Sequence, residues 1–76
     1  MNQDLEAMVE LAILTAKESN EFNYEPINWG DLHCIEIKDG FVLIEEAAPT
    51  AERFRSFVEN FLFEHGYPDL TVKTEW

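Results

Sequence analysis

The chain has 76 residues, of which sixteen are acidic and five are basic, and its formal net charge at pH 7 is −11. This length allows one small α+β domain covering residues 1–76, which buries roughly 60% of the surface that the unfolded chain exposes. The charge repels nucleic acid and anionic membrane surfaces, so it excludes both as direct partners and favours another protein, particularly one with a basic surface.

Cysteine usage and hydropathy indicate where such a protein works. The single cysteine, Cys34, leaves no disulfide, and the acidic N-terminus lacks the basic start of a signal peptide. No apolar run approaches the roughly 18 residues of a membrane-spanning helix. We therefore expect a reduced, cytoplasmic protein, whose acidity is either functional or only keeps it in solution.

Residues 3–18 are predicted to form an amphipathic helix that covers a sheet. Its main stripe is apolar and consists of Leu5, Met8, Val9, Ala12, Ile13 and Ala16. A narrower ridge on the opposite side contains Ala7, Leu11 and Leu14. Either a second copy or another partner covers Leu11 and Leu14, or they are scattered surface residues; their spacing, which lets them touch, favours the first alternative.

In residues 19–31 the apolar residues follow neither the helical nor the strand spacing, and Pro26 and Gly30 disfavour regular secondary structure. The segment nevertheless carries four large apolar residues: Phe22, Tyr24, Ile27 and Trp29. Two interpretations are open, because these side chains either close the edge of a small core or form a binding loop among acidic residues. Their number is high for a solvated linker, which favours the first interpretation.

Residues 33–46 are predicted to form a β-hairpin around Asp39-Gly40. This dipeptide favours a type I′ turn, in which both central residues have positive φ. The turn sets the register and collects four β-branched residues on one face: Ile35, Ile37, Val42 and Ile44.

After the hairpin, Thr50 is the expected N-cap of a second helix that runs to about His65. Its stripe is unusually aromatic, which suits packing on a β-branched sheet, and contains Phe54, Phe57, Val58, Phe61, Leu62 and His65. Gly66 is the expected left-handed terminator, and Pro68 prevents continuation. Residues 70–76 alternate as a third strand.

The predicted fold is α+β, with the order αββαβ and both helices on one face of a three-stranded, mainly antiparallel sheet. A single helix joins the second strand to the third, so the crossover rule favours a parallel orientation of these two strands. The simplest sheet then has the strand order 2-1-3. Its uncovered face is polar on balance but carries an apolar island, Phe41 and Leu43, and one outer strand edge stays unpaired. The polar residues expected on this face are Cys34, Glu36, Lys38, Glu45, Thr71, Lys73 and Glu75.

The sequence contains no pattern typical of a catalytic, cofactor or metal site. His33 and Cys34 are neighbours in a strand, so their side chains point to opposite faces and cannot bind one ion. Nothing activates the Cys34 thiol, since Glu36 and Glu45 disfavour the thiolate. We therefore predict no catalytic residue, no cofactor and no metal ligand, and we expect a non-enzymatic protein.

Two hypotheses for the function follow. The first is a protein-interaction module, an adaptor or regulator, that forms a homodimer through apolar candidate residues: Leu11, Leu14, Phe41 and Leu43. The second is a nucleic-acid-mimicking inhibitor whose carboxylates, including Glu36 and Glu45, occupy the phosphate sites of a basic protein. The apolar ridge and island favour the first hypothesis.

Overall fold

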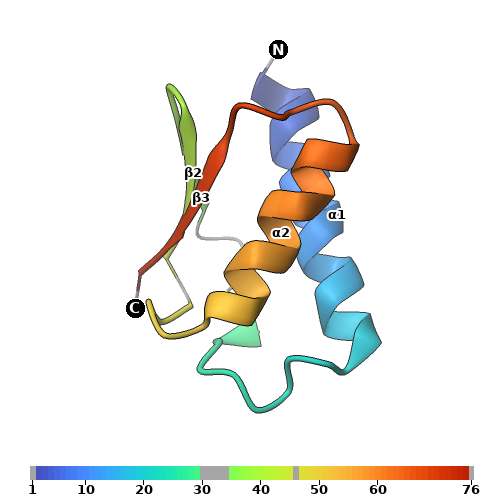
Figure 1. The fold of residues 1–76 in the computed structure, drawn as a ribbon, viewed down its shortest axis with the longest axis vertical. Helices are drawn as coiled ribbons and strands as arrows, with labels where there is room; N and C mark the ends of the chain where they lie inside the picture. The colour runs from blue at the N-terminus through green and yellow to red at the C-terminus, as the bar shows by residue number, and fades with distance from the viewer. Residues whose placement is uncertain (1, 30–34, 46, 76) are drawn as a thin grey trace.

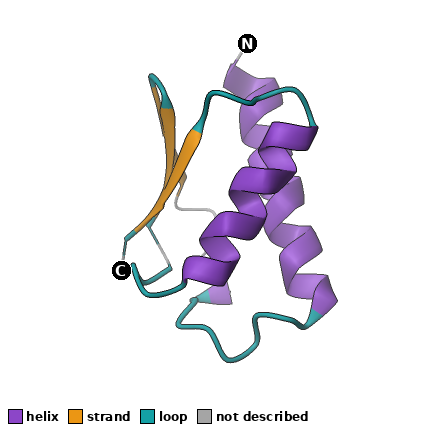
Figure 2. Ribbon diagram, viewed as in Figure 1, coloured by secondary structure: helices purple, strands orange, loops and turns teal. Residues whose placement is uncertain are grey.

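The computed structural model describes residues 2–29, 35–45 and 47–75 of the chain. Its elements are, in order, α1 (Asn2–Ser19), β1 (Ile35–Lys38), β2 (Phe41–Ile44), α2 (Glu52–Glu64) and β3 (Thr71–Thr74). Figure 1 and Figure 2 show both helices on the same side of the sheet. The predicted α+β class and element order are therefore confirmed.

The strand order in the sheet is β1-β2-β3, with β2 in the centre. β1 runs antiparallel to β2, and β3 runs parallel to β2, as the crossover rule predicts. The predicted order 2-1-3 is wrong, and the sheet is mixed rather than mainly antiparallel. The composition of the strands gives the physical reason: β2 is apolar at every position, whereas β1 and β3 each carry a lysine, a residue that protects open sheet edges.

The hairpin register is confirmed for the described strands, from Ile35 opposite Ile44 to Lys38 opposite Phe41, and the predicted pair of Cys34 with Glu45 lies outside the described residues. The predicted type I′ turn is wrong, because Gly40 has a positive φ of +87° but Asp39 does not. Glycine occupies the left-handed position, where a residue with a Cβ is strained. The register therefore depends on the two-residue loop and on the alternation of the strands, and not on the turn type.

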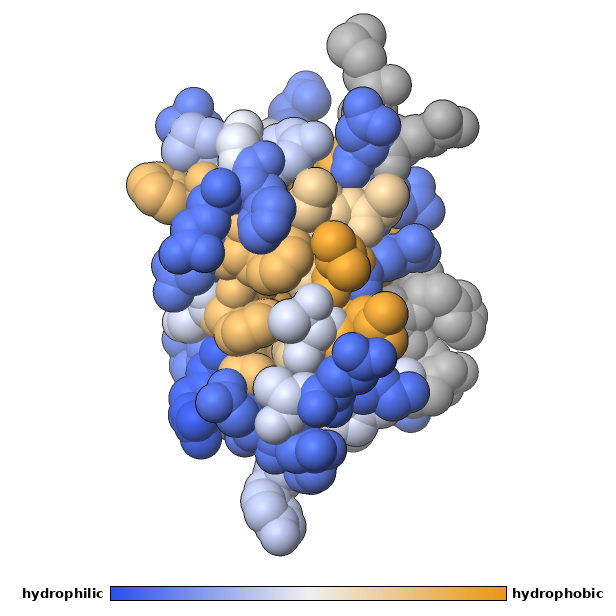
Figure 3. Space-filling view, turned by 90° about the vertical axis from the view of Figure 1, so that its right-hand side faces the viewer, coloured by the Kyte–Doolittle hydropathy of each residue, from blue (hydrophilic) through white to orange (hydrophobic). Residues whose placement is uncertain are grey.

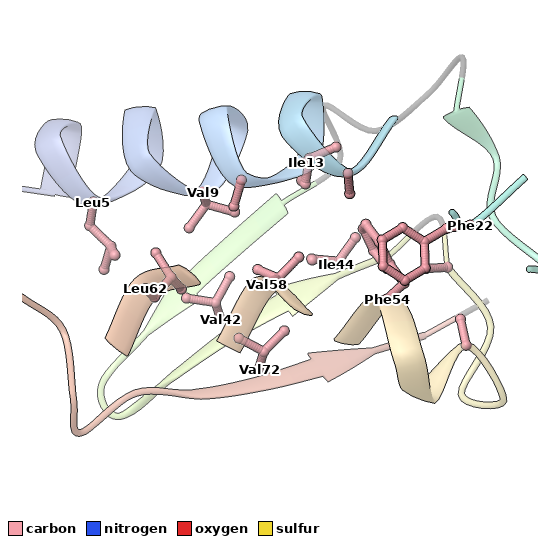
Figure 4. Close-up of a cluster of buried hydrophobic side chains, with 14 residues drawn as sticks. Leu5, Val9, Ile13, Phe22, Val42, Ile44, Phe54, Val58, Leu62 and Val72 are labelled. Atoms are coloured by element: carbon pink, nitrogen blue, oxygen red, sulfur yellow. The ribbon is translucent and has the colours of Figure 1, made fainter. Parts of the chain in front are cut away.

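The buried side chains form one cluster between the helices and the sheet. Figure 4 shows side chains from α1 and α2 pointing toward Val42, Ile44 and Val72 of the sheet. The largest fully buried side chains come from four elements: Phe54, Ile44, Leu62, Val9, Val42, Val58 and Val72. No polar or charged side chain is buried among the residues that the structure describes. Apolar burial is therefore the main stabilising interaction of the core.

The two ends of α2 differ in how well the sequence predicts them. Ala51, not Thr50, is the N-cap, and it makes no side-chain capping bond. Ala51 is fully buried, so the helix starts where the chain enters the core. The C-terminal signal is confirmed: Gly66 has a φ of +99°, and the Tyr67 N–H donates to the Leu62 carbonyl at 2.9 Å.

The aromatic segment after α1 closes one end of the core. Phe22 is buried, and the rings of Phe22 and Trp29 approach the Phe54 ring edge-on, with centroids at 6.1 Å and 5.6 Å. Tyr24, by contrast, is fully exposed. The interpretation of this segment as a cover for the core therefore holds for Phe22 and Trp29 but not for Tyr24.

We predict that Leu62→Ala strongly destabilises the domain, whereas Phe63→Ala does not. Leu62 is fully buried, and its truncation should cost about 2–5 kcal/mol, out of about 4–11 kcal/mol expected for a domain of this length. Phe63 is the neighbour in the same helix and is 61% exposed, so its truncation should change the free energy of unfolding by about 0.5 kcal/mol or less. Urea unfolding measures both; equal effects would contradict the placement of the core.

Candidate functional site

The outer side of α1 carries two exposed leucines, which we call the helix ridge. Leu11 and Leu14 are 47% and 48% exposed, because the helix turns its other face toward the core. Acidic residues flank them on the helix, and Glu10 and Glu18 are both exposed. The helix ridge is therefore apolar in the middle and negatively charged at its borders.

An aromatic row runs along α2 on the side of the helix away from β3. Phe57 and Phe61 are partly buried, with ring centroids 6.3 Å apart, and Phe22 extends the row at 5.4 Å from Phe57. His65 ends the row, stacked 4.2 Å from the Phe61 ring, with its Nδ1 atom 2.7 Å from the Phe61 carbonyl oxygen. His65 thus continues the predicted stripe at the C-cap of α2, where its side chain is exposed.

Apolar side chains of the two helices form a continuous surface. Figure 3 looks onto the helical side of the molecule and shows an apolar band across its middle, with hydrophilic residues above and below. This band lies opposite the uncovered face of the sheet. Any partner of the helix ridge therefore approaches from the side away from the sheet.

The uncovered face of the sheet has its own apolar centre, which we call the sheet island. It consists of Phe41 and Leu43 of β2, both partly exposed. Lys38 of β1 lies opposite Phe41, and Lys73 of β3 lies opposite Leu43. The Lys73 ammonium is 4.4 Å from the centroid of the Phe41 ring, a favourable cation–π distance. A cation therefore stands on each side of the island.

The carboxylates predicted to act on this face have different surroundings. Glu36 lies opposite Leu43 and forms an exposed ion pair with Lys38 at 3.6 Å, a contact that contributes little to stability. Glu45 follows β2 directly and is partly exposed. The structure thus brings the sheet island and Glu36 together, and it places the helix ridge in a different layer of the molecule.

The sequence places Lys38 and Lys73 on this face, but it did not single them out as candidate contact residues. The hairpin register alone places Lys38 beside Phe41. The contact between Lys73 and Phe41 depends on β3 lying next to β2, which the predicted order 2-1-3 would have prevented. The sequence pattern therefore did not show that β2 and β3, which are far apart in the sequence, are neighbours in the sheet.

Side chains of α2 close the outer edge of β3. The N–H groups of Thr71 and Glu75 bond back toward β2, so the Val72 backbone groups point to the open edge. There the Val72 N–H donates to Glu59 Oε2 at 2.9 Å, and Arg55 Nη1 donates to the Val72 carbonyl at 3.3 Å. Sheet extension at β3 would first have to break these bonds.

The same two side chains hold each other in place. Arg55 Nη1 donates to Glu59 Oε2 at 3.1 Å, and Arg55 Nη2 forms a second ion pair with Glu52 at 3.3 Å. Arg55 is 25% exposed, Glu59 is 35% exposed and Glu52 is 67% exposed. Arg55 is therefore held between two acidic side chains of its own helix.

The described residues offer few arrangements for chemistry. In these ranges no group of three or more His, Cys, Asp or Glu side chains is placed to hold a metal ion, and no helix is long and apolar enough to cross a membrane. His33 and Cys34 lie outside the described residues. A hollow of about 400 Å³ borders the aromatic row, lined by Phe22, Glu52, Arg53, Ser56, Phe57 and Asn60. Its lining contains no histidine or cysteine to act with Ser56.

Comparison of the chain with family models, with curated proteins and with solved structures finds no match. The functional argument therefore depends on the surfaces described above.

We predict that Glu59→Ala destabilises the domain more than Glu52→Ala. Both substitutions remove an ion pair to Arg55, but only Glu59 accepts the Val72 N–H. Loss of that acceptor should cost about 1–3 kcal/mol, against about 0–1 kcal/mol for the exposed pair. Hydrogen exchange of the Val72 amide should accelerate in Glu59→Ala alone. Equal exchange rates in the two variants would show that the edge of β3 is not held by Glu59.

Proposed function

We propose that this chain is a non-enzymatic protein-interaction module, an adaptor or regulator, that works by self-association. The observation that carries the proposal is the presence of two apolar surfaces, the helix ridge and the sheet island, in different layers of a domain with a net charge of −11. The homodimer is the smallest assembly that this proposal requires. The single cysteine supports an intracellular setting for it.

The partial exposure of Leu11 and Leu14 supports the proposal that a second copy covers this surface. Leu11 and Leu14 lie three positions apart on one helical face, and each keeps nearly half of its surface in water. Full burial of a leucine side chain stabilises by about 1.5–3 kcal/mol, so covering the exposed half of each leucine contributes about 1 kcal/mol to the free energy of association. Together with the sheet island, this is enough for a weak, concentration-dependent association and not for a permanent complex.

The closed edge of β3 disfavours strand addition at that edge, so we expect a face of the domain to form the contact. Because Glu59 and Arg55 occupy the Val72 backbone groups, a second copy gains no hydrogen bond at that position. Association through side chains on the helix ridge or the sheet island meets no such obstacle.

A nucleic-acid-mimicking inhibitor is the second candidate, and the net charge of −11 favours it. Its partner would be a protein with a basic surface. The sheet face supports this function less well, since Glu36 is paired with Lys38, and Lys73 lies over Phe41. A mimic needs an uninterrupted row of carboxylates, and on this face cations interrupt the row.

We predict that Leu14→Glu weakens self-association at least about tenfold, which corresponds to about 1.4 kcal/mol. The substitution places a charge on the helix ridge but touches no buried residue, so the urea unfolding midpoint should stay within the range of a surface substitution. Phe63→Glu is the matched control, because Phe63 is also large and exposed but lies on α2 outside both surfaces.

Light scattering over a concentration series, at low and high salt, distinguishes the candidates. The proposal predicts association of the wild-type chain that is at least as strong at high salt as at low salt, because screening reduces the repulsion between acidic copies. A wild-type chain that is monomeric at all concentrations, yet binds a basic protein only at low salt, would refute self-association and support the mimic.

A further inference from the structure

We infer that Tyr24 of one copy inserts into the hollow beside Phe22 and Phe57 of a second copy, and that the second copy does the same in return. This inference rests on the self-association proposed above and names the side chains at the centre of one contact. It combines two features that the packing of the domain leaves without a role. They are a fully exposed aromatic side chain and a hollow with aromatic side chains in its wall.

The first feature is Tyr24, which stands at the tip of an anchored turn. Its side chain is fully exposed, whereas that of Phe63 is 61% exposed. The Glu25 N–H donates to the Phe22 carbonyl at 3.0 Å, which closes a turn with Tyr24 at a central position. Phe22 is buried, and Figure 1 shows this segment projecting past the ends of both helices. A partner of Tyr24 therefore orders little additional chain, which lowers the cost of binding.

The second feature is the hollow of about 400 Å³ on the solvent side of α2. Its α2 residues share one helical face, and Phe22 closes it from the segment after α1. The rings of Phe22 and Phe57 lie 5.4 Å apart, and Phe57 is only partly buried. Pockets that hold small ligands measure roughly 300–1,000 Å³, so the hollow has room for one phenol ring.

Polar groups in the lining suit the hydroxyl of a tyrosine. Ser56 Oγ accepts a long bond from Arg55 Nη2 at 3.4 Å, which leaves the Ser56 O–H to donate. Asn60 is exposed, and its amide offers donors and an acceptor. A phenol hydroxyl donates and accepts, so Tyr24 can bond to these groups while its ring lies on Phe57.

The hollow and Tyr24 belong to one patch because Phe22 lies beside both. Two residues of chain span at most about 7 Å, which limits the distance between the backbones of Phe22 and Tyr24. A two-fold axis beside this turn brings each Tyr24 to the hollow of the other copy. Such a contact is self-complementary and closes at two copies. A second copy of the chain therefore fits this patch as its occupant.

Four charged side chains lie around the contact: Glu21 and Glu25 beside Tyr24, and Glu52 and Arg53 at the hollow. The Glu52 carboxylate already pairs with Arg55 at 3.3 Å. The Arg53 Cζ atom lies 5.7 Å from the Phe22 ring centroid, and no carboxylate of the described residues is within ion-pair distance of Arg53. Arg53 thus offsets part of the acidity that a second copy brings, and the fit of the ring selects the pairing.

The size of this contact agrees with a weak dimer. A tyrosine buries about 150–250 Å², so two rings and the walls that cover them bury roughly 600–1,000 Å². Stable complexes bury about 1,200 Å² or more in total. The hollow and the helix ridge both lie on the solvent side of the helical layer, so one interface can cover both.

The first test removes the ring. Tyr24→Ser should weaken self-association at least about tenfold, because truncation of a central aromatic anchor has large effects on binding. Tyr24→Phe keeps the ring and should lose less. Phe63→Ser is the matched control, because it removes another large exposed ring at a position outside the hollow. Tyr24 is fully exposed, so the urea unfolding midpoint should not change.

The decisive experiment mixes two variants at high salt, where added charges are screened. Asn60→Glu places a carboxylate where Tyr24 enters the hollow and leaves Tyr24 intact. Tyr24→Ser leaves the hollow intact. Two copies of either variant retain neither insertion, whereas a mixed pair retains one. Light scattering should therefore show stronger association in the equimolar mixture than in either variant alone, and weaker association than in the wild-type chain.

The outcomes separate this inference from the proposed function. If the wild-type chain associates and Tyr24→Ser associates equally well, the inference is overturned while self-association stands. A mixture that associates no more strongly than its components also overturns it. A wild-type chain without any association refutes the proposed function itself.

A direct measurement uses a sample in which half of the copies carry ¹³C. The inference predicts intermolecular nuclear Overhauser effects between the ring of Tyr24 in one copy and the ring of Phe57 in another. Their absence in an associating sample, or contacts of Tyr24 with Phe57 of its own copy at every concentration, would overturn the inference.

Discussion

Strand β2 forms hydrogen bonds along both of its edges and is apolar at all four positions, so both of its faces require cover. The inner face is covered because α1 and α2 pack their apolar stripes over Val42 and Ile44. Both helices in the described part of the chain lie on the inner face, so neither covers the outer face, where Phe41 and Leu43 stay partly exposed. The sheet island is therefore a consequence of a central apolar strand in a two-layer domain.

The β3 edge of the sheet is covered by side chains, whereas the open face of the sheet is not. At β3, the ion pair of Arg55 and Glu59 occupies the backbone groups of Val72, which removes a site for strand addition. On the open face, Lys73 lies over the Phe41 ring, and Phe41 and Leu43 still stay partly exposed. The molecule thus protects a hydrogen-bonding edge and leaves apolar side chains accessible. This combination favours association through side-chain surfaces rather than through the β3 edge.

Much of the fold could be predicted from local sequence patterns. The errors arose where contacts between residues far apart in the sequence determine the structure. The apolar stripes, the hairpin register and the terminator at Gly66 each depend on residues a few positions apart, and they were predicted correctly. The crossover rule predicted that β2 and β3 are parallel but not that they are neighbours. The contact of Lys73 with Phe41 depended on that neighbour relation. Thr50 satisfied the local pattern of a cap, but burial of Ala51 moved the helix start.

The measurement that tests the central claim most directly is a series of methyl NMR spectra of the wild-type chain at increasing concentration. The account predicts that the signals of Leu11 and Leu14 on α1, of Leu43 on β2, or of all three shift as the concentration rises, because self-association covers the exposed apolar surfaces. Signals of these leucines that stay unchanged, or shifts centred on Ile35 and Ile37 of the outer strand β1, would contradict the account and indicate that the copies do not associate or meet elsewhere.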